Sequence, residues 1–134
     1  TPSILALAAL EAGLDTFEGI AMRDVEAKAR ALSRLFVEEV EARCGAELRL
    51  ASPRDPAARG SHVVFAHPDG YAVMQALIAR GVIGDFRAPD LMRFGFTPLY
   101  TRFADVVRAA EALAGILASR EWDQPRFSER AKVT

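Results

Sequence analysis

The sequence predicts an α+β fold, in which a small and mainly antiparallel sheet is covered by helices. Two long segments, residues 22–44 and 103–119, carry apolar residues at the three- and four-residue spacing of a helix. Between them lie short runs of β-branched and aromatic residues that end near glycine or proline, as strands do. A chain of 134 residues has the length of one domain and can bury one core.

The first predicted element is a helix over residues 4–14, a segment rich in alanine and leucine and apolar nearly all round. Such a helix needs burial on several sides, which a domain of this size hardly provides. We therefore predict that its leucines do not pack fully within one copy of the chain. A second, longer helix is predicted from Met22 to Cys44, where Gly45 follows as a C-terminal cap.

The middle of the chain predicts strands joined by a helix. A short strand is expected within residues 47–50, and residues 52–60, with two prolines and alternating charges, are typical of a surface loop. Residues 62–66 favour a strand because β-branched and aromatic side chains predominate there. A turn then leads into a helix over residues 71–80, which Gly81 ends.

The last third predicts two more strands and a helix. Residues 82–83 are expected to form a short strand, and residues 91–96 a longer one that Pro98 ends. The final helix begins near Thr101 or Phe103 and runs to about Ser119, with an apolar stripe along one face. Residues 120–134 are polar, and we expect them to be loosely held.

Composition and charge argue against several classes of partner. The net charge is -1, and basic residues alternate with acidic ones along the chain instead of clustering as they do on nucleic-acid-binding surfaces. No apolar run approaches the roughly 18 residues that cross a bilayer, and the first residues lack the pattern of a secretory signal. We expect a cytoplasmic protein that binds neither nucleic acid nor membrane.

Cysteine and histidine give no sign of a metal site. The single cysteine, Cys44, has no partner for a disulfide within the chain, and its place at a helix end favours a packed or half-exposed structural thiol over a nucleophile. His62 and His67 lie five residues apart at the two ends of one predicted strand, so they are expected to point to opposite faces. Both therefore cannot bind one metal ion from that strand.

Two stretches of the sequence resemble kynureninases. They are the opening TPSILALAALEAGLDTF and the run GVIGDFRAPDLMRFGFTPLYTRF at residues 81–103. In that family a stretch R-G-V-I-G-D-F-R-x-P-x-x-x-R-F-G-F-T-P-L-Y precedes the last helix, and a segment G-T-P-P-I-L-x-L-A-A-L-E-x-G-L-D opens the C-terminal part. The resemblance covers residues 1–119, and one departure is Ser3, where bacterial members usually carry a second proline.

The resemblance implies the C-terminal small domain of the pyridoxal-phosphate (PLP)-dependent transferase fold, also called aspartate aminotransferase-like. Residues 1–119 would form that domain, with residues 1–20 as a link and helix toward a larger domain, and residues 120–134 as a polar tail. The family's enzymes are usually homodimers that hydrolyse L-kynurenine, or its 3-hydroxy derivative, to anthranilate, or 3-hydroxyanthranilate, and L-alanine in tryptophan catabolism. PLP acts in them as the electron sink.

The resemblance also implies that this chain holds no catalytic residue. In the family the larger N-terminal domain carries the lysine that forms the Schiff base, the aromatic residue that stacks on the cofactor ring and the aspartate that faces the pyridine nitrogen. The chain has only two lysines, Lys28 and Lys132, and neither lies in the family's lysine motif. The chain alone is therefore expected to be inactive.

Two residues match binding positions of the family. Thr1 matches the residue that contacts the phosphate region of PLP across the dimer, and Arg93 matches the arginine that holds the α-carboxylate of the substrate. Strand alternation supports the second assignment, since the aromatic face of residues 91–96 should pack on helices and Arg93 then points away, with Gly95 leaving room beside it. A purely structural alternative is an edge-strand arginine paired with Asp85 or Asp90.

Other functions are compatible with the same pattern. The chain could be the small domain of a cysteine desulfurase or aminotransferase, which share the fold, although Gly84-Asp85-Phe86-Arg87 and the residues from Arg93 onward favour kynureninase. It could also be a stand-alone α+β binding or dimerisation module. Such a module should begin at a methionine, whereas this chain opens at Thr1-Pro2, so we expect a piece of a longer protein.

Overall fold

Four antiparallel strands form one sheet in the computed structural model, which describes residues 2–129. The strands are β1 (Arg49–Leu50), β2 (His62–Ala66), β3 (Asp85–Arg87) and β4 (Leu91–Gly95), and the helices are α1 (Ile4–Asp15), α2 (Met22–Cys44), α3 (Gly70–Ala79), α4 (Phe103–Ser119) and α5 (Pro125–Ser128). Two short 3-10 turns, Gly45–Glu47 and Pro56–Ala58, complete the elements.

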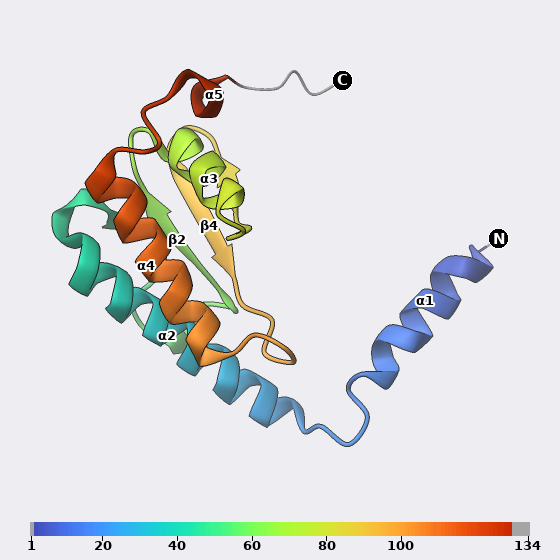
Figure 1. Ribbon diagram of the computed structural model, residues 1–134. Coiled ribbons are helices and arrows are strands. Elements are labelled where there is room, and N and C mark those ends of the chain that lie inside the picture. The colour runs from blue at the N-terminus through green and yellow to red at the C-terminus, as the bar shows by residue number, and fades with distance from the viewer. Residues whose placement is uncertain (1, 130–134) are drawn as a thin grey trace.

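The strand order β1-β2-β4-β3 places β4 inside the sheet. After α3 the chain crosses to the far edge as β3 and returns as β4 beside β2, so that all three pairings are antiparallel. α2 and α4 lie side by side in front of the sheet, and α3 covers the end nearer β3 and β4 (Figure 1). The predicted α+β fold with a sheet covered by helices is confirmed.

The core lies between the sheet and its helical layer. Phe36 of α2 is fully buried, and its ring centroid lies 4.8 Å from that of Phe94, 5.3 Å from that of Phe96 and 6.1 Å from that of Phe65. Offset and edge-on aromatic pairs at these distances add about 0.5–1.5 kcal/mol each beyond the area that they bury. The inward face of the strands therefore consists of large apolar side chains, and the polar residues of β2 and β4 point to the opposite face.

The long helix α2 has the predicted bounds. It ends at Gly45, whose φ of 55° lies in the region that side-chain-bearing residues avoid, so the glycine cap is a conformational requirement. Cys44 is buried beside this end, and burial, aided by the negative charge of Glu47, raises the pKa of its thiol to about 11. The predicted structural role of this thiol agrees with its burial.

The predicted strand at residues 82–83 is wrong. Gly81 has a φ of 81° and ends α3, and the N–H of Val82 then donates 3.0 Å back to the carbonyl of Leu77. This six-residue closure is the Schellman cap, which uses the backbone donor that a strand would have needed. Val82 packs against the core, Ile83 is exposed, and the strand begins only at Asp85.

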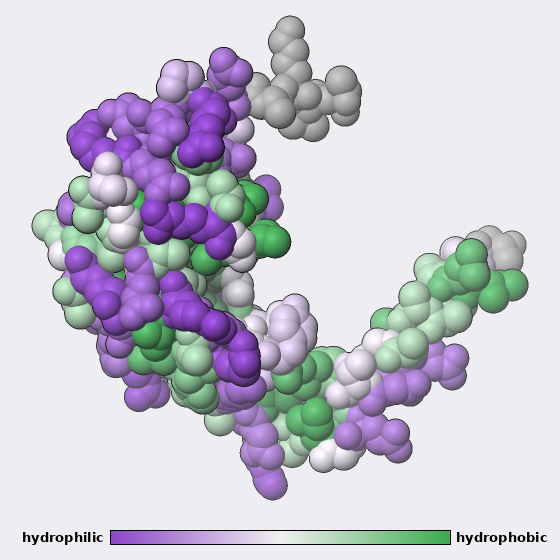
Figure 2. Space-filling view, viewed as in Figure 1, coloured by the Kyte–Doolittle hydropathy of each residue, from purple (hydrophilic) through white to green (hydrophobic). Residues whose placement is uncertain are grey.

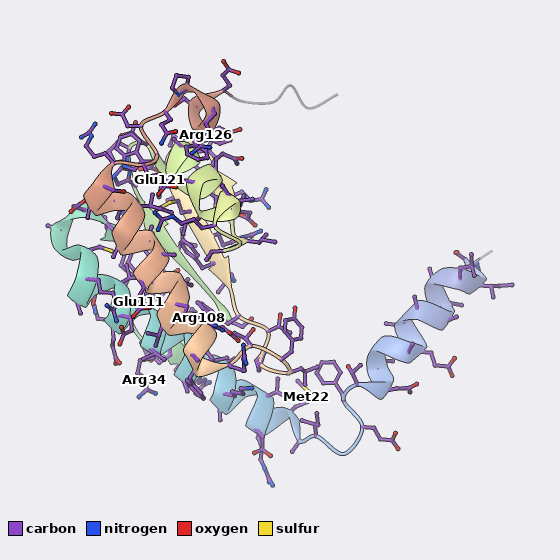
Figure 3. All side chains as sticks on the ribbon, viewed as in Figure 1. Met22, Arg34, Arg108, Glu111, Glu121 and Arg126 are labelled. Carbon is purple, nitrogen blue, oxygen red and sulfur yellow. The ribbon has the colours of Figure 1, made fainter. Side chains whose placement is uncertain are left out.

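Residues 120–129 are held more firmly than their composition predicts. α5 places Phe127 in the core, and Trp122 packs against the same core at its margin. Glu121, which is labelled in Figure 3, forms an ion pair with Arg80 at the end of α3. Two aromatic residues spaced five apart show no helical or strand period, so no local pattern predicts this packing.

The first helix, α1, stands apart from the sheet and its helices (Figure 1). The side chain of Ser3 accepts a hydrogen bond from the N–H of Ala6 and so caps its start. None of its residues is buried, and Leu5 is 84% exposed. Apolar residues cover much of its visible surface (Figure 2). The prediction that its leucines do not pack within one copy is confirmed.

Candidate carboxylate-binding groove

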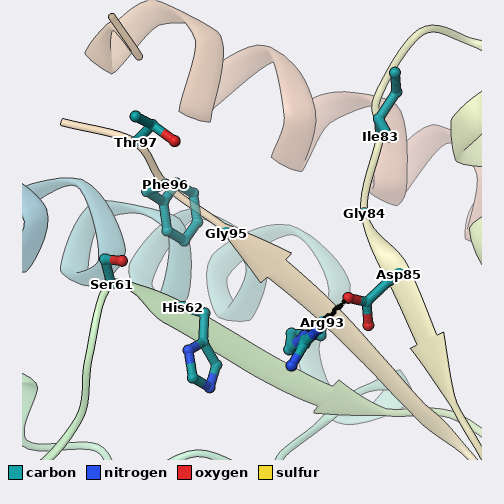
Figure 4. A pocket seen from close by; sticks show the side chains of 9 residues that line it. All are labelled: Ser61, His62, Ile83, Gly84, Asp85, Arg93, Gly95, Phe96 and Thr97. Atoms are coloured by element: carbon teal, nitrogen blue, oxygen red, sulfur yellow. Dashed lines mark hydrogen bonds and ion pairs between the residues drawn. The ribbon is translucent and has the colours of Figure 1, made fainter. Parts of the chain in front are cut away.

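The open face of the sheet, opposite the helices, carries a groove of about 510 Å³ (Figure 4). Strands β2, β3 and β4 and the segments that flank them form its walls. Its lining residues are Ser61, His62, Ile83, Gly84, Asp85, Arg93, Gly95, Phe96 and Thr97.

Strand alternation along β4 decides which side chains reach this groove. Met92 and Phe94 are buried and point to the helices, and Phe96 packs its ring on Phe36 although it also borders the groove, whereas Arg93 and Gly95 line the groove from the open face. A Cβ atom added at Gly95 would meet no atom within 4 Å, which means that the missing side chain leaves open space beside the guanidinium. The arrangement predicted for Arg93 and Gly95 is confirmed.

Arg93 is anchored by a carboxylate on the neighbouring strand. Asp85 of β3 is its direct partner in the register, and Oδ2 of Asp85 accepts hydrogen bonds from Nε of Arg93 at 2.9 Å and from Nη2 at 2.5 Å. Both side chains are partly exposed, at 38% for Arg93 and 43% for Asp85. These hydrogen bonds engage one edge of the guanidinium, and Nη1 takes no part in them.

The alternative of an edge-strand arginine paired with an aspartate is correct about the pairing with Asp85 and wrong about the edge strand. Arg93 pairs with Asp85, but β4 lies between β2 and β3 and is not an edge strand. Oδ2 of Asp90 instead lies 3.9 Å from Nη2 of Arg49, which belongs to β1, the edge strand at the other end of the sheet from β3. An interior strand holds an arginine more rigidly than an edge strand, because both neighbours fix its backbone by ladder hydrogen bonds.

Gly84 allows β3 to approach β4 this closely. A Cβ atom at Gly84 would lie 2.8 Å from the carbonyl oxygen of Arg93 and 2.8 Å from the Cε of Met74. Side-chain-bearing residues do not tolerate such distances, so the close approach depends on glycine. Because Asp85 follows directly, Gly84 also determines how near its carboxylate lies to Arg93.

The opposite wall of the groove is formed by β2. His62 pairs with Gly95 in the register, so its imidazole lies diagonally across from Arg93 on the same face (Figure 4). This place of His62 could not be predicted from the sequence, because it depends on the register of two strands about 30 residues apart in sequence. Ser61 and Thr97, also in the groove, were missed for the same reason.

The two histidines have different surroundings. His67 packs edge-on against Trp122 with ring centroids 5.7 Å apart, whereas His62 faces the groove. Partial burial lowers the pKa of His67, against the opposing effect of the nearby acids Asp69 and Glu47. Among residues 2–129, no group of three or more histidine, cysteine, aspartate or glutamate side chains is arranged to hold a metal ion.

Of the two lysines, the structure describes only Lys28, which does not line the groove. Lys28 of α2 donates a hydrogen bond of 2.6 Å to the carbonyl of Pro98 and so fastens the loop after β4 to the helix. Thr1 and Lys132 lie outside the described residues. The groove lining contains no lysine, so the described residues do not by themselves fit PLP, which needs an amine to hold its aldehyde.

The groove does suit a carboxylate. A guanidinium keeps its charge at every physiological pH and can donate two parallel hydrogen bonds to a carboxylate, which an ammonium group cannot reproduce. Arg87 adds a second positive charge, since its Nε lies 3.4 Å from Oδ1 of Asp85. With Arg87 and Arg93 around one aspartate, the surroundings of Asp85 keep an excess of positive charge.

Comparison with known proteins identifies the family. The family profile described as the kynureninase C-terminal domain matches residues 25–113, about two-thirds of the chain and all nine residues of the groove. The chain belongs to the kynureninase family. The kynureninase of Pseudomonas fluorescens is 54% identical to it over 135 residues, which is 100% of this chain and 32% of that protein. Kynureninases of Burkholderia mallei and Burkholderia pseudomallei are 52% identical with the same coverage.

The chain therefore spans about a third of the length of the curated kynureninases that it matches. Its similarity to them extends over the whole chain, so α1 and the segment around α5 are included although the family profile ends at residue 113. Among residues 2–129 no helix combines the length and apolar character that crossing a membrane requires.

Proposed function

We propose that this chain is the part of a longer kynureninase that binds the α-carboxylate of the substrate. The complete enzyme would use PLP to hydrolyse L-kynurenine, or 3-hydroxykynurenine, to anthranilate, or 3-hydroxyanthranilate, and L-alanine in tryptophan catabolism. The names of the relatives support this reaction, and the chain supports the recognition of one end of the substrate.

The proposal rests on the surroundings of Arg93 and on the donors that its ion pair leaves free. Arg93 lies in an open groove beside the empty space above Gly95, and the hydrogen bonds to Asp85 leave Nη1 and the second N–H of Nη2 for a carboxylate. An arginine that served only to join two strands would not need a groove of about 510 Å³ next to it. Its guanidinium would orient the amino-acid end of the substrate, while PLP would supply the electron sink from the part of the enzyme outside this chain.

The wider setting of the enzyme follows from the family resemblance. We propose a homodimer in the cytoplasm, with residues 1–20 as the link toward the larger domain and Thr1 near the phosphate of PLP. The exposed apolar surface of α1 supports this role for the link, since contiguous apolar surfaces usually mark a contact with another part of an assembly. The unpaired thiol of buried Cys44 fits a reducing compartment.

Replacing Arg93 with lysine in the complete enzyme tests the proposal. Lysine keeps the charge and loses the planar fork, so one charged, two-point contact to the substrate is lost. Losing such a contact costs about 2–5 kcal/mol, which corresponds to a decrease in kcat/KM of roughly 30-fold or more. Steady-state kinetics and a thermal melt of the same variant give the two quantities needed.

Arg49→Lys is the matched control, because Arg49 is exposed and lies outside the groove. Its kcat/KM should equal that of the parent enzyme. Near-normal kcat/KM for Arg93→Lys would refute the carboxylate assignment. A lowered melting temperature with normal activity per folded molecule would assign Arg93 a structural role instead.

A further inference from the structure

Asp85 holds Arg93 in an unusual way for a pair that only joins two strands. Both hydrogen bonds from the guanidinium end on the same oxygen, Oδ2. Oδ1 is buried and accepts no hydrogen bond from residues 2–129, although Arg87 Nε lies 3.4 Å away. A stability-driven ion pair would use both oxygens in a two-point fork, because a buried polar atom without a partner costs free energy. The pair is therefore not arranged for the greatest stability.

The same geometry fixes the direction of the guanidinium. The group is planar, and anchoring Nε and Nη2 on one side defines its plane and leaves the edge with Nη1 on the other side. The Arg93 side chain lies between Asp85 on β3 and His62 on β2 (Figure 4). An arginine side chain in water samples many rotamers, so an anchor of this kind removes much of the ordering cost before a ligand arrives.

The neighbouring residues support this anchoring. A Cβ atom at Gly84 would lie only 2.8 Å from the carbonyl oxygen of Arg93. The glycine therefore lets β3 lie close to β4, which determines how near the Asp85 carboxylate comes to Arg93. Arg87 lies on the opposite side of that carboxylate and offsets its negative charge, which would otherwise repel an anionic ligand at Arg93. Gly84, Asp85 and Arg87 thus together hold the side chain of Arg93 in place.

We propose that Asp85 is a positioning residue that orients Arg93 for the substrate carboxylate. This inference rests on the proposed function, since it deepens the role of the same groove. Asp85 touches neither the substrate nor the cofactor in this assignment and acts only through the guanidinium. Its removal should therefore weaken the binding of ligands that carry the amino-acid carboxylate and leave the chemical step largely intact.

Asp85→Asn in the complete enzyme tests the inference. The amide keeps the size and loses the charge and one acceptor, so the guanidinium loses its fixed plane. We expect KM to rise about tenfold and kcat to change by less than about threefold, because misplacing a positioning group weakens binding more than a step in which it takes no part. Asp90→Asn is the matched control, since Asp90 pairs with Arg49 outside the groove and should leave both constants unchanged.

A binding readout separates positioning from general damage. L-Alanine carries the α-carboxylate, and 2-aminoacetophenone carries only the aryl ketone end of the substrate. Asp85→Asn should raise the inhibition constant of L-alanine about tenfold and that of 2-aminoacetophenone by less than about twofold. Equal loss of both inhibitors would overturn the inference, and so would unchanged binding of L-alanine. Tighter binding of L-alanine would overturn it as well, because Asp85 would then compete with the ligand for Arg93.

The double variant Asp85→Asn with Arg93→Lys distinguishes this inference from the proposed function. If Asp85 acts through Arg93, the double variant should lose no more kcat/KM than Arg93→Lys alone. A loss from Arg93→Lys with none from Asp85→Asn would refute the inference and leave the proposed function standing. A harmless Arg93→Lys would refute the proposed function itself. If Asp85→Asn does not fold, Asp85→Ser carries the same tests, and failure of both to fold would assign Asp85 a structural role.

Discussion

Two glycines shape the surroundings of Arg93 by different physical means. Gly84 provides close approach, since a Cβ there would collide with the Arg93 carbonyl and with Met74 at 2.8 Å. Gly95 provides empty space, since a Cβ there would meet no atom within 4 Å. The first glycine is a requirement of packing, whereas the second is not and would matter only to the proposed ligand.

Alanine at these two positions should separate stability from binding. Gly84→Ala should lower the free energy of unfolding by about 1–3 kcal/mol, the usual cost of overpacking, because the added Cβ would collide with the backbone carbonyl of Arg93, which cannot move aside as a flexible side chain could. Gly95→Ala should leave the free energy of unfolding within about 0.5 kcal/mol of the parent value, as most surface substitutions do. Urea unfolding of the 134-residue chain measures both. A large loss of stability from Gly95→Ala would show that the space beside Arg93 is not open.

At the scale of elements, α1 differs from every other long helix of the structure. α2 and α4 each bury an apolar stripe on the sheet, whereas α1 buries none of its residues. Ser3 caps its first turn, and alanine and leucine favour the helical conformation. Capping and helix propensity therefore stabilise α1, whereas packing does not. Isolated helices of this length are marginal in water, so we propose that a contact outside this chain stabilises α1.

Polar substitutions in α1 should therefore cost no stability in this chain. Replacing Leu5, Leu7, Leu10 and Leu14 with glutamine should leave the urea midpoint unchanged, because all four side chains are more than half exposed. The same change should reduce self-association, measured by sedimentation velocity, because a contiguous apolar surface is removed. Leu32→Gln is the control that must destabilise, since Leu32 is fully buried. A lower midpoint for the α1 variant would mean that the helix packs within its own copy.

At the scale of the whole molecule, we propose that the chain recognises one end of a substrate, while the chemistry depends on the rest of a longer enzyme. Lys28 donates a hydrogen bond to the carbonyl of Pro98, and among residues 2–129 no lysine lines the groove. The relatives are about three times as long as the chain. The binding of the carboxylate and the chemistry on the cofactor would therefore belong to different parts of one enzyme.

The 134-residue chain mixed with PLP should show no absorbance band of an internal aldimine and no hydrolysis of kynurenine. The reason is that no lysine is among the described residues that line the groove, and Lys28 instead donates a hydrogen bond to the carbonyl of Pro98. Absorbance spectra with and without PLP, followed by borohydride reduction and mass spectrometry, provide the measurement. A stoichiometric adduct trapped at Lys28 would contradict this prediction, and a Lys28→Arg variant controls for nonspecific reaction at other amines.

Much of the fold could be predicted because local patterns determine it. The period of α2 and α4, the glycine after Cys44 and the alternation of residues 91–96 each depend on neighbours in sequence. The prediction failed at residues 82–83, where the cap of α3 competes with strand formation for one backbone donor. It also failed at Phe127, whose burial depends on α3, about 50 residues earlier in the chain.

The sequence by itself determined the class of fold, the family resemblance and the side of β4 on which Arg93 lies, because each of these follows from residue order and strand period. Only the tertiary structure decided that β4 is an interior strand, that Asp85 and not Asp90 holds Arg93, and that His62 faces the same groove. The physical reason is register: a shift of one residue between paired strands reverses every side chain, and no local pattern specifies which residues of two distant strands stand opposite each other.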